Sequence, residues 1–323
     1  MFRKVISSIL QVIENGDSFF LTSHINPDGD SIACETAMAL LLERLGKKKY
    51  LIANRDAAPD NYLFLPRAGK IRQAAAVKGN FDVALILDAS DPQRIGGIID
   101  LDKQVKTVIV IDHHLSGVPF GKYNYLDKDS ASCTEQIYQL IMAKFGRLTR
   151  AEATCIYTGI MTETNKFQEA NTNPAALRTT ALLLEAGVNP TAVCRKIYED
   201  NSPGQIRLLG LALSGIELSA GGRIATVAVT GNMLKKAGAG LRHCEGIINF
   251  ARSIKSVQIA ILLREQDNGY KISLRSKGDI NVNTVALHFG GGGHRRAAGF
   301  FIPGSLARVK RTMLKQVEKQ LTQ

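Results

Sequence analysis

Carboxylate and imidazole side chains gather in four short segments of the sequence. In chain order, these segments contain His24, Asp28 and Asp30, then Asp88, then Asp112, His113 and His114, and finally Glu163. Carboxylates and neutral imidazoles are the side chains that bind divalent cations. Together they predict a binding site for divalent metal ions.

Three of the four segments directly follow a predicted β-strand. The ranges 18–23, 81–87 and 106–111 are short, nearly continuous apolar runs, which are typical of strands covered on both faces. In an open parallel sheet, ligands gather at the carboxyl ends of the strands. We therefore expect the first three segments to meet at one edge of a sheet. Glu163 follows a predicted helix that begins near Arg150.

Each segment also has an ordinary structural explanation when it is taken alone. Asp28 and Asp30 could cap a helix, and Asp88 could be a turn residue. His113 or His114 could be a hydrogen-bonded core histidine. A single metal centre explains them jointly, because three of the six histidines of the chain fall in these segments.

The C-terminal part contains a second group of candidate functional residues. A glycine run followed by cationic side chains can bring backbone amides close to a phosphate or a base. Arg275 ends a predicted strand and is a candidate for a bidentate phosphate contact. The candidate substrate-binding residues are Arg275, Ser276, Gly291, Gly292, Gly293, His294, Arg295 and Arg296. A flexible linker and solvated surface charge are the alternative explanations.

The basic character of the protein is confined to its C-terminal part. The formal net charge is +12, yet residues 1–204 contain equal numbers of acidic and basic residues, so the whole excess lies in residues 205–323. A basic lobe attracts a polyanion, and nucleotide phosphate is the obvious candidate. A basic surface that only keeps the protein soluble is the alternative.

Composition and the lengths of the apolar runs exclude several classes of protein. The apolar runs are far too short to span a bilayer and no signal-peptide pattern is present, so we expect a cytoplasmic protein with no membrane partner. The five cysteines lack C-x-x-C spacing, so neither a disulfide framework nor a thiolate zinc site is predicted. We interpret them as small core residues.

The alternation of helices and strands predicts an α/β fold with a doubly wound, mainly parallel sheet in the first domain. Proline follows a capping residue at Asn173, Asn189 and Ser202, which predicts three successive helices between residues 174 and 216. We expect the domain boundary between Gly187 and Gln205, where the helices would join the first domain to the second.

The pattern changes after these helices. Strands predicted at 223–230, 257–264 and 270–275, with Asp267-Asn268-Gly269 as a hairpin signal, indicate a smaller α/β domain with a mixed sheet. The predicted organisation is a catalytic, metal-binding domain at 1–190, a helical connector at 191–216 and a substrate-binding domain at 217–323.

The motifs resemble those of the DHH phosphoesterases. His-x-Asn-Pro-Asp-Gly-Asp at 24–30, the lone Asp88 and Asp-His-His at 112–114 are similar to the first three motifs of that family. The run Gly-Gly-Gly-Gly-His-Arg-Arg-Ala-Ala-Gly at 290–299 is similar to the signature of its DHHA1 substrate-binding domain. The resemblance covers nearly the whole chain. It implies hydrolysis of short oligoribonucleotides (nanoRNA) to mononucleotides, or of 3′-phosphoadenosine 5′-phosphate to AMP, by metal-activated water.

The resemblance also implies two manganese ions bridged by Asp88, with magnesium or cobalt as substitutes. One ion would be held by His24, Asp28 and Asp88. The other would be held by Asp30, Asp88, His113 and Glu163. Asp112 and His114 would be the catalytic pair, in which Asp112 orients the adjacent imidazole and His114 faces the scissile phosphate.

Two departures from the family pattern bear on these expectations. Glu163 stands where the fourth motif usually has an aspartate, and one extra methylene displaces its carboxylate. Ala33-Cys34 replaces a common Gly-Ser pair, which we interpret as a change in helix packing.

Two other functions stay open. One is a phosphodiesterase of cyclic dinucleotides or their linear dinucleotide products. The other is a nucleotide-binding protein with an impaired metal site. The expected partners are short RNA or DNA oligonucleotides or nucleoside bisphosphates, and a homodimer is typical of similar proteins.

Overall fold

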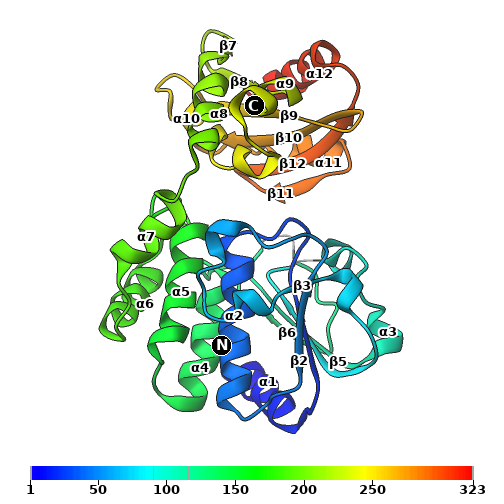
Figure 1. Cartoon of the computed structure of the whole chain (residues 1–323), viewed down its shortest axis with the longest axis vertical. Coiled ribbons are helices and arrows are strands. Elements are labelled where there is room, and N and C mark those ends of the chain that lie inside the picture. The colour runs from blue at the N-terminus through cyan, green and yellow to red at the C-terminus, as the bar shows by residue number, and fades with distance from the viewer. Residues whose placement is uncertain (1, 90, 115–116, 322–323) are drawn as a thin grey trace. The chain divides into compact units, whose positions relative to one another are not determined.

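The chain folds as two compact units in the computed structural model, which describes residues 2–89, 91–114 and 117–321. The first unit is Met1–Asp200 and the second is Asn201–Gln323. Each unit has its own sheet and its own apolar core, so each is described separately (Figure 1).

The first unit contains a sheet whose paired strands are all parallel. Its strands are β1 (Phe19–Thr22), β2 (Tyr50–Asn54), β3 (Arg72–Gln73), β4 (Phe81–Leu87), β5 (Val105–Asp112) and β6 (Tyr123–Leu126). Their order is β3-β2-β1-β4-β5-β6, so the chain builds outward from β1 on one side and from β4 on the other. Strand order therefore reverses between β1 and β4, and such a switch point is where ligands bind in open α/β sheets.

Helices cover both faces of this sheet, as expected for a doubly wound fold. The helices of the first unit are α1 (Arg3–Asn15), α2 (Gly29–Arg44), α3 (Leu101–Gln104), α4 (Cys133–Phe145), α5 (Arg150–Glu163), α6 (Pro174–Glu185) and α7 (Pro190–Tyr198). Helices α1, α2, α4 and α5 pack on one face, where α2, α4 and α5 lie side by side (Figure 1). The short α3 and a 3₁₀ turn at Pro92–Ile95 cover part of the other face.

Side-chain caps fix where the helices begin. The Asp28 carboxylate accepts hydrogen bonds from backbone amides at the start of α2, and Ser132 does the same for α4. Thr149 and Glu152 form a reciprocal capping box at the start of α5. These caps place the first turns of α2 and α4 at the carboxyl edge of the sheet.

The second unit contains a mixed sheet of order β11-β12-β10-β9-β8-β7, in which only β8 and β9 pair in parallel among the described strands. Its strands are β7 (Glu217–Ser219), β8 (Ile224–Val229), β9 (Ile259–Gln266), β10 (Gly269–Ser276), β11 (Gly292–His294) and β12 (Ala297–Pro303). Its helices are α8 (Pro203–Ser214), α9 (Gly231–Ala237), α10 (Ile247–Ser253), α11 (Asn283–His288) and α12 (Leu306–Glu318). The predicted α/β class, with a parallel first sheet and a separate mixed second sheet, is confirmed.

The range 191–216, expected to connect the domains, is divided between the two units. Val193 and Ile197 of α7 belong to the core of the first unit, whereas Leu208 and Ala212 of α8 belong to a core of the second. The chain passes from one unit to the other at residues 200–201. Among the described residues, no helix is both long enough and apolar enough to cross a membrane.

Candidate metal centre

The four predicted segments meet at the carboxyl edge of the first sheet. His24 follows β1, Asp88 follows β4, and His113 follows β5. Asp30 lies in the first turn of α2, and Glu163 is the last residue of α5. Parallel strands point their carboxyl ends to the same edge, and this brings residues from distant parts of the chain together.

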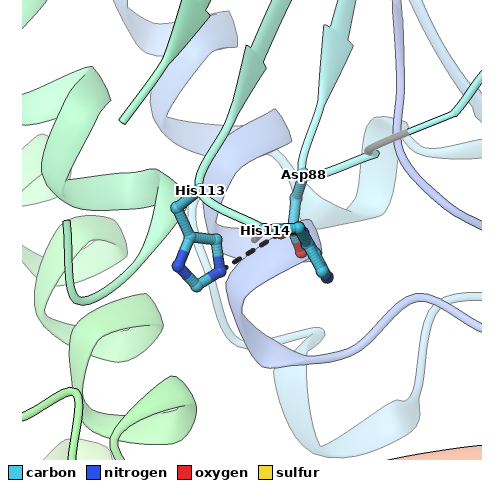
Figure 2. A group of neighbouring side chains, drawn as sticks. All are labelled: Asp88, His113 and His114. Carbon is cyan, nitrogen blue, oxygen red and sulfur yellow. Dashed lines mark ion pairs between the residues drawn. The ribbon is translucent and has the colours of Figure 1, made fainter. Parts of the chain in front are cut away.

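Asp88 lies at the middle of this group. Its Oδ2 is 3.5 Å from His24 Nε2, and its Oδ1 is 3.7 Å from His113 Nε2 and 3.6 Å from His114 Nδ1. Figure 2 shows Asp88 beside the two adjacent histidines. The two carboxylate oxygens of Asp88 therefore face different partners.

Three sets of side chains lie close enough for each set to hold one cation. Within each set, one potential ligand atom from every residue lies within 4.8 Å of the others. The sets are His24, Asp28 and Asp88; Asp30, His113 and Glu163; and Asp88, His113 and His114. All of these residues were singled out from the sequence.

The backbone of Asp88 is in the left-handed region, with φ of 55°. This conformation is uncommon for residues other than glycine, and aspartate and asparagine tolerate it best. Asp88 is also only 2% exposed. A buried carboxylate on a strained turn at a strand end is the kind of outlier that concentrates at functional sites.

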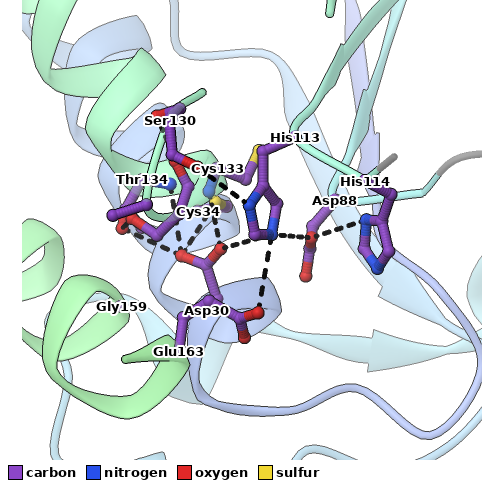
Figure 3. Close-up of polar contacts among 12 residues, drawn as sticks. Asp30, Cys34, Asp88, His113, His114, Ser130, Cys133, Thr134, Gly159 and Glu163 are labelled. Atoms are coloured by element: carbon purple, nitrogen blue, oxygen red, sulfur yellow. Dashed lines mark hydrogen bonds and ion pairs between the residues drawn. The ribbon is translucent and has the colours of Figure 1, made fainter. Parts of the chain in front are cut away.

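Asp30 is held by the amino-terminal end of α4. Its Oδ2 accepts a hydrogen bond from the Cys133 amide at 2.7 Å. Its Oδ1 accepts bonds from the amide and the hydroxyl of Thr134, at 3.2 and 2.9 Å. These contacts, drawn in Figure 3, orient the carboxylate toward His113 Nε2, which lies 3.9 Å from Oδ2.

Each histidine is oriented through its Nδ1 atom. His24 Nδ1 donates to the Ile25 carbonyl at 2.8 Å, and His113 Nδ1 lies 3.3 Å from the Ser130 carbonyl. These contacts direct the Nε2 atoms of both rings toward the carboxylates. His114 is arranged differently, because its Nδ1 donates to Asp112 Oδ1 at 2.6 Å. Figure 3 shows His113 and His114 on opposite sides of Asp88.

Burial of so many carboxylates shifts their pKa values in opposite directions. Burial, reinforced by the charge of Asp88, raises the pKa of Asp30 to about 7, and burial raises the pKa of Glu163 well above its usual range. Burial also opposes ionisation of Asp88, but its hydrogen bond with His24 and the nearby imidazoles hold its pKa well below the usual range. For His113, burial alone would lower the pKa, but the carboxylates of Glu163, Asp88 and Asp30 raise it to about 9.

These shifts indicate a cluster with more negative charge than its surroundings neutralise. In the described part of the chain, the ion pairs of Asp30, Asp88 and Glu163 are made with histidines. Asp88 Oδ1 is buried and accepts no hydrogen bond from the described residues. A buried acceptor of this kind, surrounded by oxygen and imidazole nitrogen donors, fits a divalent cation.

The candidate substrate-binding residues come together in the second unit. Arg275 at the end of β10 and His294 in β11 both pair with Ala297 of β12. Arg295 donates two hydrogen bonds to the Asp279 carbonyl, at 3.1 and 2.8 Å. The side chain of His294 lies outside the described residues, so only its backbone is placed.

Two members of this set have structural tasks. Ser276 is 2% exposed and donates its hydroxyl hydrogen to the Ile280 carbonyl at 2.7 Å, so the structure does not place it with the exposed members. Arg296 lies 3.5 Å from the Asp279 carboxylate. Both contacts close the turn that follows β10.

The glycine run forms part of the edge strand β11 and the segment that leads into it. Gly292 and Gly293 belong to β11, which pairs with β12. A Cβ at Gly291 would lie 2.3 Å from the Gly299 carbonyl oxygen, so close backbone contact requires glycine there. The linker explanation therefore does not hold, since Gly292 and Gly293 are part of the sheet and Gly291 packs closely against β12.

Comparisons with known proteins agree with this arrangement. The sequence profile described as "DHH family, N-terminal domain" matches residues 18–160, and the profile described as "DHHA1 domain" matches residues 221–323. The chain belongs to the DHH/DHHA1 family of phosphoesterases. The resemblance found in the motifs is thereby confirmed.

Relatives align with the chain over nearly its full length. A bifunctional oligoribonuclease and PAP phosphatase NrnA of Thermus thermophilus is 29% identical, over 99% of this chain and 94% of that protein. A protein of the same name from Bacillus subtilis is 24% identical, over 91% of this chain and 92% of that one.

Solved structures of DHH proteins share the fold. An exopolyphosphatase-related protein from Bacteroides fragilis superposes with a TM-score of 0.90 at 28% identity, covering 98% of this chain and 96% of that one. An exonuclease RecJ bound to manganese has a TM-score of 0.52 at 12% identity, over 99% of this chain and 94% of that one, and shows the fold alone.

Sequence reasoning missed several residues that support this DHH centre. Ser31 donates to Asp88 Oδ2 at 2.8 Å and lies 3.0 Å from His24 Nε2. Glu35, fully buried in α2, accepts a hydrogen bond from the Asn54 side chain at 3.0 Å. Spacing within α2 gave a partial signal, because Ser31 and Glu35 are four residues apart and share the helix face that Asp28 begins.

Proposed function

We propose that this DHH phosphoesterase hydrolyses short oligoribonucleotides to mononucleotides, 3′-phosphoadenosine 5′-phosphate to AMP, or both, with two manganese ions. The names of the relatives that align over nearly the full chain support this substrate class. The basic second unit, which carries the whole charge excess, is suited to the phosphates of such substrates.

The two faces of Asp88 carry the proposal. One oxygen faces His24 and the other faces His113, so the carboxylate can be shared between two cations. The sets of side chains around it supply further ligands on each side. We assign His24, Asp28 and Asp88 to one ion, and Asp30, Asp88, His113 and Glu163 to the other.

A pair of bound divalent cations would supply an acidified water molecule and stabilise charge on the transferring phosphoryl group. The residues of the chain prepare this chemistry. Asp112 accepts the Nδ1 hydrogen of His114 and so fixes the orientation of this ring beside Asp88. The α4 amide donors hold Asp30 in one orientation before any substrate binds.

Phosphate and mononucleotide release tests the proposal. We would assay a dinucleotide, a trinucleotide, a cyclic dinucleotide and 3′-phosphoadenosine 5′-phosphate in parallel, with manganese, for the unmodified protein and for Asp88→Asn. Asparagine is chosen because it tolerates the left-handed backbone of Asp88. Asp91→Asn is the matched control, since Asp91 caps a 3₁₀ turn and an asparagine oxygen can accept the same bond.

We expect turnover of the linear dinucleotide or of the bisphosphate, loss of that turnover in Asp88→Asn, and full turnover in Asp91→Asn. Equal rates in the unmodified protein and Asp88→Asn would overturn the metal centre. Preferential hydrolysis of the cyclic dinucleotide would show that cyclic dinucleotides, and not the proposed linear substrates, are what this protein hydrolyses. Nucleotide binding without turnover would establish a binding protein with an impaired metal site.

A further inference from the structure

Two adjoining hollows lie where β2 begins, at the amino-terminal end of that strand. Their volumes are about 310 and 380 Å³, and both are lined by Lys48, Tyr50 and Leu51. We call them together the basic hollow. Its cationic lining residues are Lys48, Lys49, Lys70, Arg72 and Lys78.

The charge of the basic hollow is not a by-product of composition. Residues 1–204 carry equal numbers of acidic and basic side chains, yet the residues lining the hollow include five cations and no carboxylate. In the described part of the chain, Glu43 pairs with Lys70 at 2.9 Å. No ion pair with a carboxylate is found there for Lys48, Lys49 or Lys78. Like charges gathered this way repel one another unless an anion lies between them.

Two of the cations are held in fixed positions. Arg72 donates hydrogen bonds to the carbonyls of Gly69 and Ile71, at 2.8 and 3.2 Å. Lys70 donates to the Tyr50 hydroxyl at 2.7 Å, and its ammonium group lies 4.8 Å from the centre of the Tyr50 ring. Preorganised cations lose less side-chain entropy when they bind a phosphate.

The hollow also offers an apolar wall. Leu51 and Phe81 are half-buried, and the Phe81 ring packs against Phe20 with ring centres 5.4 Å apart. An aromatic ring supported from behind is a surface on which a nucleobase can stack.

The site is separate from the metal centre. Strand β2 begins at the hollow with Tyr50 and ends with Asn54, which contacts the Ser23 amide beside the metal centre. The strand rises about 3.3 Å per residue, so the two ends are roughly 13 Å apart. A ligand in the hollow is therefore not the substrate in its reactive position.

We propose that the basic hollow binds a nucleoside polyphosphate, with its phosphates on Lys48, Arg72 and Lys78 and its base against Phe81. The combination of oriented cations, an aromatic wall and lysines that form no carboxylate ion pair within the described residues suits that ligand class. This proposal does not depend on which substrate the metal centre hydrolyses.

Photo-crosslinking of the full-length, manganese-loaded protein with 8-azido-ATP tests the proposal, with the modified peptide mapped by mass spectrometry. We expect label on the peptides that carry Tyr50 or Phe81. Lys48→Glu/Lys78→Glu should reduce this label about tenfold or more, because two charge-assisted phosphate contacts are lost. The matched control is Lys4→Glu/Lys122→Glu, which reverses two exposed lysines outside the hollow and should label normally.

Competition distinguishes the sources of phosphate. Unlabelled ATP should protect the two peptides better than tripolyphosphate or a 5′-phosphorylated dinucleotide does. Equal protection by tripolyphosphate would show that the base does not contribute to binding through Phe81. Stronger protection by the dinucleotide would show that the hollow binds RNA. Either result would overturn the proposal that it binds a nucleoside polyphosphate. Label that is absent from these peptides, or unchanged in Lys48→Glu/Lys78→Glu, would overturn the site itself. Hydrolysis by Lys48→Glu/Lys78→Glu should match the unmodified protein.

Discussion

The Asp30 carboxylate lies directly against the backbone of Gly159. A Cβ atom at Gly159 would come within 2.5 Å of Asp30 Oδ1 and within 2.3 Å of Thr134 Oγ1. Helix α5 therefore approaches α2 and α4 closely enough to shape the metal centre, although Gly159 offers no ligand of its own. The close approach requires a residue without a side chain.

Gly159→Ala should destabilise the protein by about 1–3 kcal/mol, because a methyl group forced into a packed, hydrogen-bonded site displaces its neighbours. It should also weaken manganese binding by moving Asp30. The matched control is Gly210→Ala in α8, where a Cβ meets nothing within 4 Å. Alanine there should stabilise by about 0.5–1 kcal/mol. Urea unfolding measures the stability of both variants. Equal changes in the free energy of unfolding for Gly159→Ala and Gly210→Ala would contradict the packing argument.

Asp112→Asn should lower kcat about 10–100-fold while KM and the number of bound manganese ions stay unchanged. The physical reason is that Asp112 acts through His114, whose Nδ1 hydrogen it accepts at 2.6 Å. Steady-state kinetics and elemental analysis give these quantities. In a His114→Ala background, the same substitution should have little further effect, because the two residues act as one unit. Independent, additive losses would argue against this coupling.

Glu163→Gln should weaken the binding of one manganese ion by about 100-fold, since loss of a ligand is expected to cost at least as much as loss of an outer partner. Glu163 Oε1 lies 3.7 Å from His113 Nε2, and these two residues form a potential ligand set with Asp30. Glu163→Asp, which keeps the charge but shortens the side chain, should have a smaller effect. Calorimetric titration with manganese measures the affinities of the Glu163→Gln and Glu163→Asp variants. The control is Glu185→Gln on the exposed face of α6.

The central strands and the ligands could be predicted because both signals are local. Strands β4 and β5 are continuous apolar runs, and Asp88 and His113 follow their ends directly. The capping residues Asn173, Asn189 and Ser202 likewise marked the starts of α6, α7 and α8 correctly. Functional residues that directly follow a strand or a helix can be predicted without knowledge of the fold.

The rest depends on contacts between distant segments. Strand β2 follows a lysine run that gives no strand signal, and β11 is built from glycines whose pairing with β12 decides their conformation. Glu35 of α2 and Asn54 of β2 are ordinary polar residues until the fold brings these two elements together. No local pattern encodes such a pairing.

Glu35→Gln should change how stability depends on pH. Burial raises the pKa of Glu35 to about 7, above its ordinary value of 4.5. The folded protein therefore holds a proton at Glu35 that the unfolded chain releases, so the contribution of Glu35 to stability falls as the pH rises from about 4.5 to 7 and stays low above pH 7. Glutamine stays neutral, so the variant should gain stability relative to wild type across that window, by up to about 3 kcal/mol at pH 8.

Denaturant unfolding of both proteins at pH 4.5 and pH 8 measures this difference. Taking the difference between variant and wild type removes the titration of the other buried groups, because Asp30 and the histidines are present in both. Glutamine can keep the bond from Asn54, since its carbonyl oxygen can replace Glu35 Oε2. A stability difference that is the same at both pH values would show that the fold does not raise the pKa of Glu35 above its ordinary value.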